Sequence, residues 1–173
     1  MACIHLYHGN GKGKTTAAAG LALRAAAAGM GVCIVQFLKS RASGEMRLLG
    51  EMTGVTVLRG KAGEHFTNAM TAEERAETLK ISNRNCMSAY TMALCGRAEL
   101  VILDEVCAAW KEDLVNHALI EKFFSDELKN TEIVLTGRNP PPLFVEKADY
   151  ITEFVKIRHP FDNGLTAREG IEY

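Results

Sequence analysis

The sequence contains no segment that is apolar and long enough to form a membrane-spanning helix. Its most apolar stretch, residues 17–38, is interrupted by Arg24, Gly29 and Gly31, whereas a membrane helix needs about 20 consecutive apolar residues. The first residues also lack the charged and apolar regions of an export signal. We therefore expect a cytoplasmic protein with no membrane partner.

An excess of basic charge is lacking too. The 173 residues include 20 Lys and Arg against 21 Asp and Glu, which gives a formal net charge of −1. Because affinity for nucleic acid depends mainly on neutralising phosphates, we expect no nucleic-acid partner. The five cysteines form no C-x-x-C pair and the five histidines show no metal-ligand spacing. This pattern argues against a disulfide framework or a zinc site, and it favours a reducing compartment.

Short apolar runs alternate along the chain with segments of helical spacing. The predicted strands cover residues 3–8, 32–38, 55–58, 100–105, 132–137 and 150–157. The predicted helices cover residues 14–28, 71–96, 113–128 and 140–148. Continuous apolar runs are typical of parallel strands covered on both faces. We expect one α/β domain over residues 1–173, with a doubly wound, mainly parallel sheet flanked by helices.

A glycine-rich loop, "HGNGKGKTT" at residues 8–16, separates the first strand from the first helix. Such a loop can aim successive backbone N–H groups at one anion, and the following helix adds its positive end. This context predicts a phosphate-binding P-loop of the RecA-like class. The loop departs from G-x-x-x-x-G-K-[ST] because His8 stands at the first glycine. The residues expected to bind nucleotide here are Gly9, Asn10, Gly11, Lys12, Gly13, Lys14, Thr15 and Thr16.

Further candidates follow two other strands at the same sheet edge, where ligands of such folds bind. Asp104 and Glu105 end the run "LVILDE", and with the Thr15 hydroxyl they are the candidate Mg²⁺ ligands. Arg138 follows the next strand, where its guanidinium can bind phosphate in a bidentate manner. Arg24 in the first helix is a further nucleotide-binding candidate, although a solvent-facing position is an equally good interpretation.

The loop predicts nucleotide binding but does not decide the reaction. The N-K-x-D motif of GTPases is missing, and the segment 137–150 contains a single arginine where a small-molecule kinase would have an arginine-rich lid. Other motifs must therefore decide the reaction.

Several segments resemble one family, the P-loop type of ATP:cob(I)alamin (corrinoid) adenosyltransferases. They are "GNGKGKTTAA" at 9–18, "QFLK" at 36–39, "LVILDE" at 100–105, "LTGR" at 135–138, "ADYITE" at 148–153 and "RHPFDNGLTAREGIEY" at 158–173. The short loop without the first glycine is itself characteristic of that family. The resemblance implies that the chain transfers the 5′-deoxyadenosyl group of ATP to the Co(I) of a reduced corrinoid and releases triphosphate. Two alternatives stay open: another ATP-dependent transferase or kinase, and a nucleotide-gated corrinoid carrier without chemistry.

The resemblance also implies residue roles and partners. Lys14, Thr15, Glu105 and Arg138 would be catalytic by stabilising triphosphate, with Mg²⁺ as cofactor. ATP would bind in the reverse sense, so that its 5′ carbon faces cobalt. Phe66 would contact the corrinoid and help to displace its lower axial base, although Asn68 stands where the family's best-known pattern has a second aromatic residue. A homodimer and an electron donor such as reduced flavodoxin are implied as well.

Overall fold

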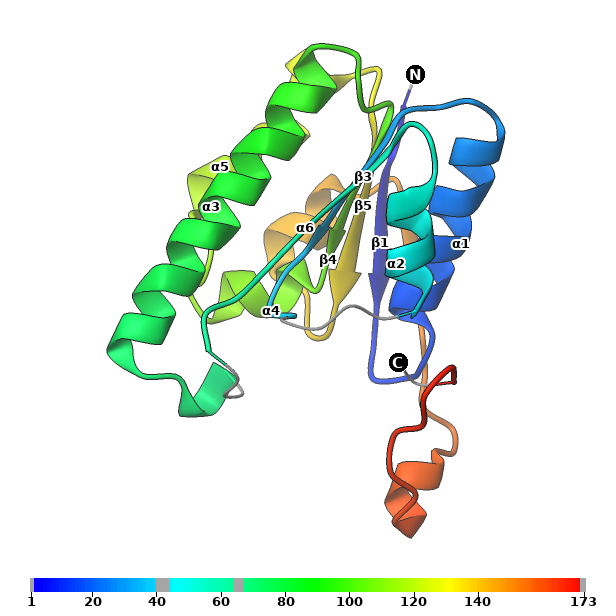
Figure 1. Cartoon of the computed structure of the whole chain (residues 1–173), viewed down its shortest axis with the longest axis vertical. Coiled ribbons are helices and arrows are strands. Elements are labelled where there is room, and N and C mark those ends of the chain that lie inside the picture. The colour runs from blue at the N-terminus through cyan, green and yellow to red at the C-terminus, as the bar shows by residue number, and fades with distance from the viewer. Residues whose placement is uncertain (1, 40–43, 64–66, 172–173) are drawn as a thin grey trace.

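The computed structural model describes residues 2–39, 44–63 and 67–171, and these form a six-stranded sheet with helices on both faces (Figure 1). The strands are β1 (Ile4–His8), β2 (Val32–Gln36), β3 (Val55–Arg59), β4 (Leu100–Asp104), β5 (Glu132–Gly137) and β6 (Tyr150–Glu153). The α-helices are α1 (Lys14–Ala27), α2 (Gly44–Glu51), α3 (Ala72–Leu94), α4 (Val106–Lys111), α5 (His117–Glu121) and α6 (Pro142–Lys147). Short 3₁₀ turns are η1 (Thr67–Ala69), η2 (Lys122–Phe124), η3 (Asp126–Leu128) and η4 (Pro160–Asn163).

The strands are arranged in the order β3-β2-β4-β5-β1-β6, and every neighbouring pair is parallel. The prediction of a doubly wound parallel sheet is therefore confirmed. All strands end at the same edge, so the loops that follow them converge there. The sheet places β5 between β1, which leads into the glycine loop, and β4, which leads into the acidic pair.

Two hydrophobic layers hold the helices on the sheet. On one face, small residues of α1 such as Ala18 and Ala22 pack with α2 against Leu100 and Ile102 of β4. On the other face, α3, α4 and α6 pack against a layer that includes Leu103. Figure 1 shows α1 and α2 on one side of the sheet and α3, α4 and α5 on the other. All five residues of β4 are buried because successive side chains face the two layers in turn, which explains the continuous apolar run from Leu100 to Leu103.

The C-terminal segment leaves the body of the molecule after β6. Figure 1 shows residues beyond this edge strand extending past the glycine loop and folding into the short η4 turn. All four residues of β6 are exposed. The predicted strand over 150–157 is thus shorter than expected, because after Glu153 the chain hydrogen-bonds to the glycine loop instead of continuing the ladder.

The helix predicted over residues 113–128 is wrong. The chain turns at Asp113, whose φ is 52°, after α4 has ended at Lys111, and it then forms α5 and two 3₁₀ turns. A left-handed residue cannot continue an α-helix, and Asn116 caps a new helix by accepting a hydrogen bond from the N–H of Ala118. The long α3 is confirmed, including the capping box between Thr71 and Glu74.

Candidate nucleotide-binding site

The glycine loop forms a tight turn between β1 and α1. Gly9 and Gly13 have φ of 110° and 112°, a left-handed region that favours glycine. Gly13 is the N-cap of α1, and this residue makes no side-chain hydrogen bond to the first turn of the helix. An uncapped helix N-terminus of this kind is suited to bind an anion.

The position of His8 explains the missing first glycine. His8 is the last residue of β1 and stays in register with Gly137 of β5 and Glu153 of β6. The turn starts one residue later, at Gly9. A Cβ atom at Gly9 would lie 2.4 Å from the carbonyl oxygen of Phe154, so this position also requires glycine for close backbone contact. The loop is therefore one residue shorter than the usual pattern.

A pocket of about 1060 Å³ lies over this loop. Its described lining residues are Asn10, Gly11, Lys12, Gly13, Lys14, Thr15, Thr16, Lys39, Glu45, Glu105, Arg138, Lys156, His159, Phe161, Asp162 and Ile171. Five of them belong to the C-terminal segment. Two hydrogen bonds join that segment to the loop. The N–H of Gly11 donates to the carbonyl oxygen of Phe154 at 2.6 Å, and the N–H of Lys156 donates to Oδ1 of Asn10 at 2.9 Å.

Asp104 lies beneath the pocket and is completely buried. Its Oδ1 accepts hydrogen bonds from Thr15 Oγ1 at 2.8 Å and Thr136 Oγ1 at 2.7 Å. Its Oδ2 accepts from Lys39 Nζ at 2.7 Å and Gln36 Nε2 at 3.2 Å. Burial alone would raise the pKa of Asp104, but the Lys39 ammonium and these hydrogen bonds outweigh it and lower the pKa below its ordinary value.

Glu105 faces the pocket in a strained backbone conformation. Its φ is 63°, which is uncommon for a residue other than glycine, and its N–H donates to Thr136 Oγ1 at 2.9 Å. Burial and the nearby Asp104 carboxylate raise the pKa of Glu105 above its ordinary value, although Lys39, Lys14 and Arg138 act in the opposite direction. The carboxylate of Glu105 therefore sits where a bound cation would stabilise it.

Lys14 bends back over the loop that precedes it. Its Nζ donates to the carbonyl oxygens of Gly9 at 2.8 Å and Gly11 at 2.9 Å. The pKa of Lys14 is lower than its ordinary value. Burial is the main cause and the Arg138 guanidinium adds to it, although the Glu105 carboxylate acts in the opposite direction. The electrostatic effect of Arg138 on both Lys14 and Glu105 indicates that these three charges meet in one site.

The structure brings most of the predicted site residues together. Loop residues 10–16, Glu105 and Arg138 all line the pocket, Gly9 lies at its base, and Asp104 is buried below it. Arg24 is exposed and is not among the described residues that line the pocket. Phe66 lies outside the described residues, and so does the side chain of Asn68.

Sequence reasoning missed Lys39 and the C-terminal wall of the pocket. Lys39 follows β2 at the same sheet edge as the other candidates, so its position after a predicted strand was an available signal. Lys156, His159 and Phe161 gave no such signal, since they follow an edge strand whose continuation cannot be predicted from local spacing.

The parallel sheet, the glycine loop at a helix N-terminus and the acidic strand end define a P-loop nucleotide-binding protein of the RecA-like class. A solved structure of a KaiC-like protein from Pyrococcus horikoshii has the same fold, with a TM-score of 0.55 at 17% identity over 90% of this chain and 74% of that one. At this identity the likeness concerns the fold alone.

The whole chain, residues 1–173, matches the family model described as ATP:corrinoid adenosyltransferase BtuR/CobO/CobP. The chain therefore belongs to this family. A corrinoid adenosyltransferase of Sinorhizobium is 35% identical over 95% of this chain and 77% of its own length. Those of Pseudomonas aeruginosa and Escherichia coli K12 are 31% and 32% identical, over 97% and 98% of this chain and 82% and 85% of theirs.

Two further observations concern metals and membranes. Within residues 2–39, 44–63 and 67–171, no three His, Cys, Asp or Glu side chains gather as a metal-binding cluster. In the same part of the chain, no helix is sufficiently long and apolar to traverse a bilayer.

Proposed function

We propose that this protein transfers the 5′-deoxyadenosyl group of ATP to the Co(I) of a reduced corrinoid. The electron pair of cobalt forms the bond to the 5′ carbon, the bond between that carbon and its oxygen breaks, and triphosphate leaves with the electron pair. The observation that carries the proposal is the convergence of an uncapped helix N-terminus, Lys14 and Arg138 on one pocket in a chain of the ATP:corrinoid adenosyltransferase family.

The residues around the pocket suit this displacement. Co(I) is a strong nucleophile, so the protein needs to orient the substrates and stabilise the leaving group, not to supply a base. Lys14, Arg138 and the N–H groups of the loop offset the charge that accumulates on triphosphate. Thr15, Thr16, Asn10 and Lys12 complete the cradle around the phosphates, while Arg24 contributes at most from outside the pocket wall.

The donor groups fit a magnesium ion. Thr15 Oγ1 donates its proton to Asp104, which leaves its lone pairs available for a cation, and Asp104 and Glu105 supply carboxylate oxygens of the kind that Mg²⁺ prefers. When bound, Mg²⁺ would supply positive charge to the triphosphate. Thr15, Asp104 and Glu105 are the residues that would hold it, directly or through water.

ATP binds in the reverse of the usual sense, with its terminal phosphate deep in the loop and its 5′ carbon open to the corrinoid. This orientation is supported by the family of the chain, because transfer of the adenosyl group to cobalt requires that the 5′ carbon be accessible to the corrinoid. The corrinoid lies over the strand ends, and Phe66 helps to displace its lower axial base.

The remaining parts of the proposal concern assembly and setting. The chain functions as one domain in the cytoplasm, and a reduced flavodoxin-type protein supplies the electron that makes Co(I). The chain functions as a homodimer. Exposed apolar side chains of the edge strand β6 and of the C-terminal segment support this proposal, among them Tyr150, Ile151, Val155 and Ile157.

One assay tests the reaction directly. The protein is incubated with ATP, Mg²⁺ and chemically reduced cobalamin, and the products are followed by ³¹P NMR and by the visible spectrum. We expect triphosphate together with a light-sensitive cobalt–carbon product. Formation of ADP would identify a kinase or another transferase instead. Saturable binding of both substrates without any product would identify a carrier.

A further inference from the structure

The ammonium group of Lys39 lies among the groups that we assign to magnesium. Lys39 Nζ is 2.7 Å from Asp104 Oδ2 and 3.5 Å from Thr15 Oγ1. Lys39 lies just after β2, whereas Thr15 lies in the first turn of α1 and Asp104 ends β4. Three separate segments thus place one positive charge between a hydroxyl and a buried carboxylate.

We propose that Lys39 is an internal counterion that occupies the magnesium position of the nucleotide-free protein and is exchanged for the metal when the metal and nucleotide bind. An ammonium group and a divalent cation within a few ångströms repel each other strongly at a partly buried site, where water screens them less than in bulk. The ammonium and a magnesium ion therefore exclude each other from the space beside Thr15 and Asp104. This inference rests on the magnesium site proposed above.

The burial of Asp104 gives a reason for such an exchange. Its side chain is 0% exposed, and an unpaired carboxylate there would be costly. Lys39 is 31% exposed on its side chain, so it has a route out of the site that Asp104 lacks. The exchange leaves Asp104 paired with a cation in both states.

Gln36 supplies a second, independent observation. Its Nε2 is oriented toward Asp104, while its Oε1 is buried and has no hydrogen-bond partner among the described residues. A buried acceptor without a donor is unusual in a folded protein. The Gln36 amide lies beside Asp104, so water bound to an incoming magnesium ion would offer this oxygen a donor, whereas the Lys39 ammonium is hydrogen-bonded to Asp104 Oδ2.

Lys39 also has an alternative position. Its side chain lines the same pocket as Lys14 and Arg138, where the triphosphate of ATP would bring several negative charges. The released ammonium thus pairs with a phosphate oxygen. Lys39 would act first as a substitute for the metal and then as a phosphate-binding residue.

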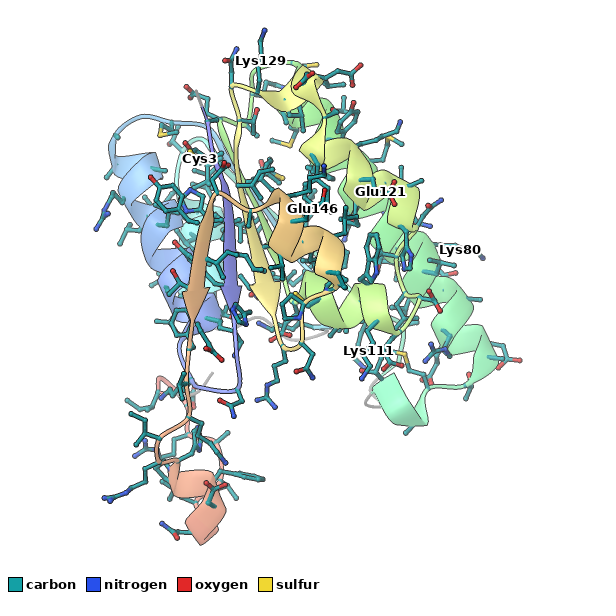
Figure 2. The ribbon with its side chains drawn as sticks, turned by 180° about the vertical axis from the view of Figure 1, so that it is seen from behind. Cys3, Lys80, Lys111, Glu121, Lys129 and Glu146 are labelled. Atoms are coloured by element: carbon teal, nitrogen blue, oxygen red, sulfur yellow. The ribbon has the colours of Figure 1, made fainter. Side chains whose placement is uncertain are left out.

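The test is metal affinity without nucleotide, measured by the electron paramagnetic resonance signal of free Mn²⁺. Wild type, Lys39→Met, Lys39→Arg and Lys129→Met are titrated with Mn²⁺ alone. Lys129 is the matched control because it is exposed and lies at the end of the molecule opposite the C-terminal segment (Figure 2). We expect Lys39→Met to bind Mn²⁺ about tenfold or more tightly than wild type, and Lys39→Arg and Lys129→Met to resemble wild type.

One further variant, a stability measurement and a binding measurement make the result decisive. Adding Asp104→Asn to Lys39→Met should abolish the gain in Mn²⁺ affinity. Without metal, Lys39→Met should unfold at a lower temperature than wild type, and Mn²⁺ should raise its Tm more than that of wild type. Lys39→Met should also bind inorganic triphosphate with Mg²⁺ several-fold more weakly. An Mn²⁺ affinity of Lys39→Met within twofold of wild type would overturn the exchange.

Failure of this inference is distinguishable from failure of the proposed function. If Lys39→Met gains no affinity while wild type still forms triphosphate from ATP and reduced corrinoid, the exchange is wrong and the function stands. If Mn²⁺ affinity rises as expected while no triphosphate forms, the exchange stands and the proposed reaction is wrong.

Discussion

Gly11 and Phe154 join the glycine loop to the C-terminal segment through a hydrogen bond of 2.6 Å from the N–H of Gly11 to the carbonyl of Phe154. They are 143 positions apart, yet a Cβ atom at Gly11 would lie 2.7 Å from that carbonyl oxygen. This close contact requires glycine at position 11, although the φ angle of Gly11 is one that other residues also adopt. Residues that follow Phe154 form one wall of the pocket, so this contact connects the loop to that wall.

Gly11→Ala should therefore detach the C-terminal segment from the loop. The methyl group cannot fit against backbone atoms, so we expect protease cleavage after Phe154 to accelerate and the KM for ATP to rise about tenfold, a loss of roughly 1.4 kcal/mol. Gly20→Ala is the control, since no described atom lies within 4 Å of its Cβ position in α1. It should stabilise the protein by about 0.5–1 kcal/mol and leave KM unchanged. Unaltered proteolysis of Gly11→Ala would contradict this account.

Lys14→Ala tests the charge that faces the leaving group. Loss of this ammonium should cost about 2 kcal/mol or more of transition-state stabilisation, or about thirtyfold in kcat/KM. Steady-state kinetics with pre-reduced cobalamin measures the effect. Lys147→Ala, on α6, removes the same charge from an exposed surface position and should behave as wild type. A near-normal kcat/KM for Lys14→Ala would remove this residue from the mechanism.

Glu105→Gln should make the nucleotide-free protein more stable but less active. Because burial and Asp104 raise the pKa of Glu105 in the folded state, its ionised form destabilises the nucleotide-free protein at neutral pH. The neutral amide should raise the free energy of unfolding at pH 8 by about 1 kcal/mol and lower activity. The wild type regains this stability as the pH falls through the raised pKa toward the ordinary carboxyl pKa. The difference in unfolding free energy between the variant and the wild type should therefore shrink in that pH range. Urea unfolding at several pH values measures it, and a less stable variant at pH 8 would refute the explanation.

Asp104→Asn should have the opposite effect on stability. The pKa of Asp104 is lowered in the folded state, so its carboxylate stabilises the protein above the ordinary carboxyl pKa, and that contribution is lost as the pH falls through the lowered value. The introduced amide would also present N–H donors to Lys39 or Gln36, which are donors themselves. We expect a loss of about 2–4 kcal/mol at pH 7, measured by urea unfolding. A loss below about 0.5 kcal/mol would contradict the network, since that is the range of ordinary surface substitutions.

Phe66→Ala addresses the corrinoid. If Phe66 displaces the lower axial base, the variant should turn over cob(II)alamin with a reductase several-fold more slowly than wild type, because reduction becomes harder. Turnover of chemically reduced cob(I)alamin should change little. Stopped-flow spectroscopy on both substrates checks the difference, and equal losses on the two would reject the role.

The sequence predicted those parts of the site that depend on local signals. The glycine loop lies between a strand and a helix, and Asp104, Glu105 and Arg138 stand at the ends of apolar runs. Because the carboxyl ends of parallel strands meet at one edge of a sheet, the sequence predicted that these residues lie at the same edge. The same rule applied to Lys39 after β2 would have placed it there too. The contact of Phe154 with Gly11 was beyond such reasoning, because nothing in the local spacing links the two residues.

The errors in secondary structure have a similar origin. The helix predicted over 113–128 was based on the spacing of four apolar side chains, Leu114, Leu119, Phe123 and Phe124. Leu114 and Phe123 are indeed buried, and the other two pack against the core. The left-handed Asp113 and the cap at Asn116 divide the segment, however, and short helices held by tertiary packing do not need a continuous pattern. The helices α2 and α4, with 8 and 6 residues, were missed for this reason.

The orientation of ATP is the central claim, and a crystal structure of the protein with ATP and Mg²⁺ tests it most directly. The account predicts that the terminal phosphate lies against the N–H groups of the loop and Lys14, with the 5′ carbon of the ribose open toward the corrinoid side. A structure with the adenosine end buried and the terminal phosphate pointing outward would contradict it.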